Sequence, residues 1–340
     1  MEWTADVATG DWLRERLDAP WAYTMHDVVP RGFEAYARVF HPAARERPEG
    51  RPWPALPFDA HRREWDAFHR ANPKTITEPV TWAQTAAAMG TTMHPLAQWT
   101  HLVAPGVIVE NEDFSPDSDG WRYLDPELGA LDPQPLATLA ALLAEATTTP
   151  DAGCIAIWEG WGDLVGGMHV DQPHGFFFPE PGMPRRYVGG APDSPGQART
   201  EAILYRSLKD VFNNPFRKAT WRPGILSDEI SRGPRLELPN RSYVLFRGGI
   251  SAFTDPAWVL DVPWRDLPAE EHGFPPSSRP PNLVWPDDHA WVMVSEIDWD
   301  STIVAGSTEL IDAIVADPAL EAASVPADAD LSWDADEENR

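Results

Sequence analysis

The sequence predicts an α+β fold, with a mostly antiparallel or mixed sheet packed by several short helices and joined by long proline-rich loops. Segments with strand and helix patterns do not alternate regularly along the 340 residues, as they would in a doubly wound parallel sheet. The 36 prolines are spread along the chain and fix the backbone where they fall, which shortens regular elements. The 17 tryptophans indicate an aromatic core whose indole N–H groups need partners.

The helices are predicted from apolar residues spaced three and four positions apart. Thr81 and Gln84 form a capping-box pattern, and Gly90 supplies the left-handed end of that helix. Asp132 and the proline after it open the clearest helix, and Ser307 caps the last one. The predicted helical segments are 11–17, 60–72, 82–89, 133–146, 201–212 and 308–316.

Four segments are rich in β-branched and aromatic residues, which favours strands. Residues 33–39 alternate in a way that predicts a half-buried strand, and the apolar run from Cys154 predicts a central strand. The strongest remaining strand patterns cover residues 241–249 and 289–299.

The chain shows no internal repeat and no linker that divides it, so a single domain over residues 1–325 is predicted. The formal net charge is −26, and residues 287–340 hold 15 Asp and Glu against one Arg. Residues 326–340 are therefore predicted to be an acidic, disordered tail.

Composition argues against several classes of function. The single cysteine, Cys154, allows no intrachain disulfide and no cysteine metal cluster. The start of the chain lacks the pattern of a secretory signal, and no apolar run approaches the roughly 20 residues of a membrane span. The acidity disfavours nucleic acid and anionic membranes. A cytoplasmic protein is expected.

Several segments carry a resemblance. The stretches VPRGFEAYARVFHP, AIWEGWG, RSYVLFRGG and PNLVWPDDHAWVMVSEIDWDSTIVAGS resemble a family of bacterial proteins from high-GC genomes. That resemblance implies no activity and no site residue. The acidity and the final strand–strand–helix layout are similar to those of the Smi1/Knr4-like proteins, several of which are toxin immunity proteins, and this likeness implies a protein-binding role.

The stretch GGMHVDQPHGFFF holds the one pattern of a metal site. On an extended strand, His169 and Asp171 would point to one side, and with His272 they would form a facial triad for Fe(II). With Arg279 to bind a carboxylate, the order resembles that of the 2-oxoglutarate oxygenases. A local clip of His169, Asp171 and His174 is a second metal arrangement. A glycine-flanked loop without metal is the favoured interpretation.

Carboxylates provide the other candidate sites. Glu296, Asp298 and Asp300 alternate along a predicted strand and would share one acidic face, which could bind a basic protein. With Glu159 they could instead form the carboxylate pair of a hydrolase. No complete catalytic constellation is visible, so the sequence favours protein–protein binding, of the immunity or regulator type, over the oxygenase and hydrolase alternatives.

Overall fold

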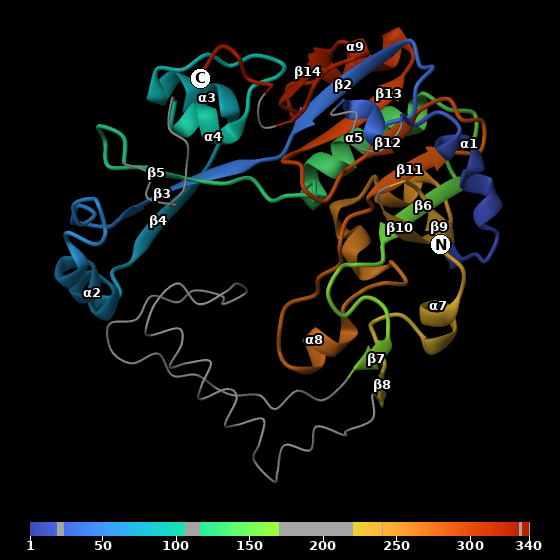
Figure 1. Cartoon of the computed structure of the whole chain (residues 1–340), viewed down its shortest axis with the longest axis horizontal. Helices are drawn as coiled ribbons and strands as arrows, with labels where there is room; N and C mark the ends of the chain where they lie inside the picture. Colours follow the sequence, from blue (N-terminus) through green and yellow to red (C-terminus); the bar gives the residue numbers. More distant parts are fainter. Residues whose placement is uncertain (19–23, 106–115, 170–219, 240, 333–334, 340) are drawn as a thin grey trace.

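The computed structural model describes residues 1–18, 24–105, 116–169, 220–239, 241–332 and 335–339. Its main sheet is antiparallel throughout, with the strand order β1-β10-β6-β11-β12-β13-β2-β14 and with β9 also paired to β10 (Figure 1). The strands are β1 (Glu2–Trp3), β2 (Ala35–Phe40), β6 (Gly153–Trp158), β9 (Leu236–Glu237), β10 (Ser242–Arg247), β11 (Leu283–Pro286), β12 (Val292–Val294), β13 (Ser301–Gly306) and β14 (Ala322–Val325). The predicted α+β class is confirmed.

Both faces of the main sheet are buried. One face packs against α5 (Pro133–Glu145), α9 (Thr308–Ala316) and the 3-10 helices η3 (Ile250–Phe253) and η4 (Pro256–Leu260). The other face packs against the N-terminal segment, which contains η1 (Val7–Gly10), α1 (Asp11–Arg14) and η2 (Met25–Asp27), and against residues near the C-terminus. Strand β2 is consequently buried along nearly its whole length, whereas its sequence predicted a half-buried strand.

A second, three-stranded sheet continues from the first. It has the order β4-β3-β5, formed by β3 (Ala43–Pro48), β4 (Thr75–Val80) and β5 (Arg122–Leu124). The chain passes from β2 into β3 through His41 and Pro42, and Figure 1 shows β3 and β4 running away from the main sheet toward α2 (Arg62–Ala71). Helices α3 (Trp82–Met89) and α4 (Trp99–Val103) pack beside the junction of the two sheets.

Helix ends follow the predicted local chemistry. The capping box of Thr81 and Gln84 is present, Gly90 has a left-handed conformation, and the Ser307 hydroxyl accepts from the amide of Leu310. The predicted helix over 201–212 lies outside the described residues. The remaining elements are α7 (Asp228–Arg232), α8 (Leu267–Glu271) and the two-stranded sheet of β7 (Gly167–His169) and β8 (Thr220–Arg222).

The C-terminal segment differs from the disordered tail that its charge predicts. Ala329 and Leu331 lie in the core on the second face of the main sheet, and Asp336 is fully buried. Small apolar residues alternate with the acids here, so the segment buries its apolar side chains while most of its carboxylates stay solvated.

Within the described parts of the chain, no helix combines the length and apolar composition that a bilayer crossing requires.

We predict that Gly129→Ala destabilises the protein more than Gly50→Ala does. Both glycines have positive φ angles, +66° and +74°, so alanine strains either backbone by about 1 kcal/mol. A Cβ atom on Gly129 would also lie 2.5 Å from the Cα atom of Ile297, whereas nothing lies within 4 Å of one on Gly50. Overpacking should add about 1–3 kcal/mol at Gly129. Urea unfolding of both variants measures this, and equal losses would contradict the close packing of the 127–130 segment against Ile297.

Candidate functional site

A cavity of about 400 Å³ lies between the start of α5, the segment after β6 and the segment that leads from η4 to β11. Its volume falls in the range of small-ligand sites. Buried side chains, including Leu131, Leu164, Trp258 and Trp264, form its base. Exposed residues, including Glu127 and Asp132, form its mouth. We call this cavity the tryptophan pocket.

Three indole rings line the tryptophan pocket, and two of them are held by hydrogen bonds. Trp161 donates from Nε1 to Oδ1 of Asn282 at 3.1 Å, and Trp264 donates to the carbonyl oxygen of Arg279 at 2.8 Å. The indole N–H of Trp258 is buried and has no hydrogen-bond partner among the described residues. A buried donor without a partner is costly, and because this nitrogen has almost no accessible surface it does not face the open cavity.

The one arginine at the mouth is already engaged. The Arg279 guanidinium lies 4.5 Å from the centroid of the Trp161 ring, and its Nη1 atom lies 3.3 Å from Oε1 of Glu127. The guanidinium is thus engaged within the protein by the ring of Trp161 and by the carboxylate of Glu127. Arg279 therefore shapes the mouth, and it is the one basic residue that the described structure places in the pocket lining.

The backbone of Glu127 is held by a buried chain of hydrogen bonds in which each group donates to the next. His41 Nδ1 lies 2.7 Å from the carbonyl oxygen of Glu127, so this nitrogen carries the proton and donates. Its Nε2 then accepts from the Thr302 hydroxyl at 2.9 Å, and Thr302 accepts from Ser295 at 2.6 Å. Burial lowers the pKa of His41 to about 4, which keeps the ring neutral and suited to this chain.

Asn282 likewise holds residues of the pocket wall through hydrogen bonds. Its Oδ1 accepts from the backbone amide of Trp158 at 2.8 Å as well as from Trp161, and its Nδ2 donates to the carbonyl oxygen of Ser295 at 3.1 Å. Buried polar groups thus hold two elements of the pocket wall before any ligand arrives, which limits the entropy lost on binding.

Asp132 is the carboxylate at the mouth that remains unneutralised. It precedes α5, but its side chain makes no capping hydrogen bond, and it has no ion pair within the described structure. Desolvation by the surrounding protein raises the pKa of its carboxyl. The third pocket carboxylate, Asp266, accepts from the amide of Ala269 and caps α8. Asp132 is therefore the group most available to an incoming cation.

One hydroxyl of the pocket lining is engaged within the protein, since Ser278 donates its hydroxyl proton to the carbonyl oxygen of Val259 at 2.9 Å. Across the described residues, no three His, Cys, Asp or Glu side chains are placed to hold a metal ion. Cys154 is buried elsewhere in the sheet, and burial raises the pKa of its thiol, which disfavours a reactive thiolate.

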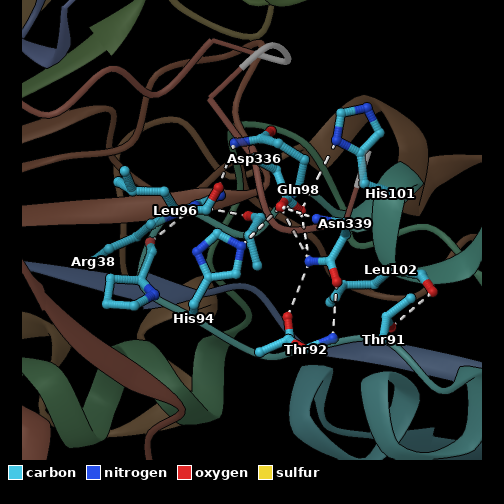
Figure 2. A network of polar contacts seen from close by, with 12 residues as sticks. Arg38, Thr91, Thr92, His94, Leu96, Gln98, His101, Leu102, Asp336 and Asn339 are labelled. Carbon is cyan, nitrogen blue, oxygen red and sulfur yellow. Dashed lines mark hydrogen bonds and ion pairs between the residues drawn. The ribbon is translucent and has the colours of Figure 1, made fainter. Parts of the chain in front are cut away.

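A second buried polar cluster lies between α3, α4 and the C-terminus (Figure 2). Asp336 accepts from His94 Nε2 at 2.8 Å and from the amide of Gln98 at 3.1 Å. Arg38, on β2, forms an ion pair with Asp300 at 3.1 Å and donates to the carbonyl oxygen of Ala97 at 2.9 Å. This cluster is enclosed, so it joins parts of the fold and offers no open site.

The three acids of the predicted acidic face do not lie on one strand. Strand β12 ends at Val294 and β13 begins at Ser301, so Glu296, Asp298 and Asp300 occupy the connection between them. Glu296 is buried and Asp298 is exposed, and both pair with Arg241, at 2.9 and 2.6 Å. Asp300 pairs with Arg38. The strand prediction fails after Val294 because the chain turns there, and two of the acids pair with Arg241 while the third pairs with Arg38.

The residues of the hydrolase and iron alternatives lie on other elements, and the iron alternative falls only partly within the described residues. Glu159 accepts from Arg235 Nε at 2.8 Å and so is engaged in an ion pair. His169 ends β7, and His272 is exposed just after α8. Asp171 and His174 lie outside the described residues. The Fe(II) site of His169, Asp171 and His272 stays a prediction.

Comparison with protein-family models, with curated proteins and with solved structures gave no match.

Of the tryptophan pocket residues, the sequence marked only Arg279 as a site candidate, and it did so within the oxygenase alternative. Asp132 was visible as the start of a helix, but its missing capping bond depends on the loop conformation. The three tryptophans are separated by up to about a hundred positions, and His41 looked like an ordinary loop residue. A weak signal was the grouping of Trp158 and Trp161 with Glu159 and Asp163 at the end of a predicted strand.

We predict that acidification destabilises the protein partly through His41. The pKa of His41 is about 4 in the folded protein and roughly 6.5 in an unfolded chain, so between these values the unfolded state binds the extra proton. Stability should therefore fall as the pH drops from 6.5 to 4, by up to about 3 kcal/mol from this residue. Urea unfolding at pH 7 and pH 5 should show a smaller acid-induced loss in His41→Gln than in the unmodified protein. An identical loss would contradict a buried neutral imidazole.

Proposed function

We propose that this protein acts by binding a basic protein partner, and that a lysine or arginine side chain of that partner enters the tryptophan pocket. Catalysis has no part in this proposal. The sequence already favoured protein–protein binding. The proposal adds which surface binds and which chemical group the partner presents.

The observation that carries the proposal is the Asp132 carboxylate at the mouth of an aromatic cavity, which has no cationic partner among the described residues. A lysine or arginine side chain combines an apolar stem with a charged head. The stem would pack against Trp161 and the base of the pocket, and the head would reach Asp132. An arginine stacked on a tryptophan is already realised in the mouth by Arg279 and Trp161.

The balance of charge supports a cationic ligand. Glu127, Asp132 and Asp266 line the pocket with Arg279 as the one basic residue, and Arg279 is paired with Glu127. The whole chain carries a net charge of −26, which would attract a basic partner and speed its association at low salt.

The remaining acidic surface would contribute to steering more than to specific contact. Glu309 and Asp312 on α9 are exposed and form no ion pair with the described residues. Exposed charges of this kind are screened by salt and add little to affinity individually. The pocket, where solvent is partly excluded, would supply the specificity.

We predict that the protein binds Nα-acetyl-arginine amide and Nα-acetyl-lysine amide, and binds the neutral Nα-acetyl-citrulline amide at least about tenfold more weakly, since one charge-assisted hydrogen bond is lost. Asp132→Asn should weaken binding of the two cations by about fivefold to tenfold and leave citrulline binding unchanged. Isothermal titration calorimetry at 50 mM and 300 mM salt measures these affinities.

The matched control is Asp312→Asn, which removes the same charge from an exposed position on α9. It should leave the affinities within about twofold at either salt concentration, because exposed charges are screened over roughly 10 Å. Equal effects of the two variants would contradict a role for Asp132. Equal affinities for arginine and citrulline amides would contradict a cationic ligand altogether.

A further inference from the structure

Large apolar side chains that face solvent are concentrated around the tryptophan pocket. The described part of the chain exposes six of them, and four lie on the segments 127–130 and 258–279, whose first and last residues line the pocket. These four are Leu128, Leu260, Leu267 and Phe274, which are 50, 43, 56 and 66% exposed. We call them the apolar rim.

Leu128 projects from a segment whose backbone is anchored on both sides of it. The carbonyl oxygen of Glu127 accepts from His41 at 2.7 Å, and the amide of Gly129 donates to the carbonyl oxygen of Trp299 at 2.8 Å. The backbone at Leu128 is therefore fixed at one side of the pocket mouth, while its side chain faces solvent.

Leu267 and Phe274 lie on a loop that starts and ends at the pocket. The amide of Asp266 donates to the carbonyl oxygen of Ser277 at 2.9 Å, and both of these residues line the pocket. The loop between them carries α8, which Figure 1 shows apart from the main sheet. The amide of Phe274 donates to the carbonyl oxygen of Ala269 at 3.2 Å, and two prolines follow Phe274 and stiffen the return of the chain.

Arg265 connects Leu260 to this loop. Its guanidinium donates to the carbonyl oxygen of Leu260 at 3.0 Å, and to the two carboxylate oxygens of Glu270 at 2.6 and 2.8 Å. Two parallel hydrogen bonds to one carboxylate hold both groups in a defined orientation. Leu260 and the loop around α8 are thus joined on the same side of the pocket.

The apolar rim has the properties of a binding surface. Exposed apolar patches beside polar groups mark interaction sites in soluble proteins. Binding energy concentrates on large side chains that surround a pocket, and an ordered backbone reduces the entropy lost when they are buried. The rim combines both features, because its side chains are exposed and its backbone is held by hydrogen bonds.

Charge around the rim favours a protein partner with basic residues. Asp132 lies at the pocket mouth, and the exposed acids Asp261 and Glu271 lie close to the rim residues in sequence. Carboxylates beside apolar side chains disfavour an anionic membrane, and a net charge of −26 on each chain disfavours a second copy of the protein.

We propose that the apolar rim and the tryptophan pocket form one protein-binding surface, which recognises a basic residue flanked by apolar side chains. This inference rests on the proposed function and adds the chemistry of the residues beside the cation. The basic side chain would enter the pocket, and its apolar neighbours would be buried against the rim.

Calorimetric titration of the full chain with two peptides of equal charge tests the proposal. The probes are acetyl-Leu-Leu-Arg-Leu-Leu-amide and acetyl-Ser-Ser-Arg-Ser-Ser-amide. The leucine peptide should bind about tenfold more tightly or better, because burial of even one leucine side chain changes an affinity by about that factor.

Substitutions in the rim should affect the leucine peptide alone. Phe274→Ser and Leu267→Ser should each weaken its binding by about fivefold and leave binding of the serine peptide within about twofold. The matched control is Val315→Ser, which removes an apolar side chain that is 39% exposed on α9. It should leave the affinities for both peptides within about twofold.

Equal affinities for the two peptides, or equal effects of Phe274→Ser and Val315→Ser, would overturn the role of the rim. Asp132→Asn tests the pocket separately and should weaken both peptides by about fivefold to tenfold. If it weakens neither peptide while Phe274→Ser still weakens the leucine peptide, the proposed function fails and the rim remains an apolar site alone.

Two further measurements test other occupants of the rim. Flotation with phosphatidylcholine vesicles should leave the protein unbound, and sedimentation velocity should give the same value for the unmodified protein and for Phe274→Ser. Vesicle binding that Phe274→Ser abolishes, or a dimer that Phe274→Ser dissociates, would assign the rim to a membrane or to a second copy and overturn the proposal.

Discussion

The structure depends on the burial of both faces of its main sheet. A sheet covered on two sides can hold almost no polar group without a partner, because an unpaired buried donor or acceptor costs about 1–3 kcal/mol. Arg38, His41 and Asn282 all lie in this covered region. Each has several polar partners. Arg38 pairs with Asp300 and donates to backbone carbonyl oxygens. His41 forms hydrogen bonds with Thr302 and Glu127, and Asn282 forms them with Trp158, Trp161 and Ser295.

The same partners also form hydrogen bonds to residues of the tryptophan pocket wall. His41 and Asn282 each use one side to satisfy the sheet and the other to hold a residue of the pocket wall, Glu127 and Trp161 respectively. The pocket is thus an edge of the core where polar groups anchor indole rings at fixed positions. Such a surface suits recognition, since a ligand meets walls that are already ordered. Asp132 has no ion pair among the described residues, and in our proposal it is the group that recognises a positive charge.

Local chemistry was readable in the sequence, and long-range pairing was not. The capping box at Thr81, the stop at Gly90 and the cap at Ser307 follow from a few neighbouring residues, so these helix ends were predicted correctly. Burial of β2 on both faces could not be predicted, because it depends on residues near both termini that cover the second face of the sheet. The neutralisation of Glu296 by Arg241 joins residues 55 positions apart, and the hydrogen bond between His94 and Asp336 joins residues further apart still. Charge alone favoured exposure in both cases.

The central claim is that Asp132 receives a cationic side chain in the tryptophan pocket. A crystal structure of the protein grown with Nα-acetyl-arginine amide tests it most directly. We expect a guanidinium within about 3 Å of the Asp132 carboxylate, the usual separation of a charge-assisted hydrogen bond, with its stem against Trp161. An empty pocket at a concentration that saturates binding in solution, or a ligand bound away from Asp132, would contradict it.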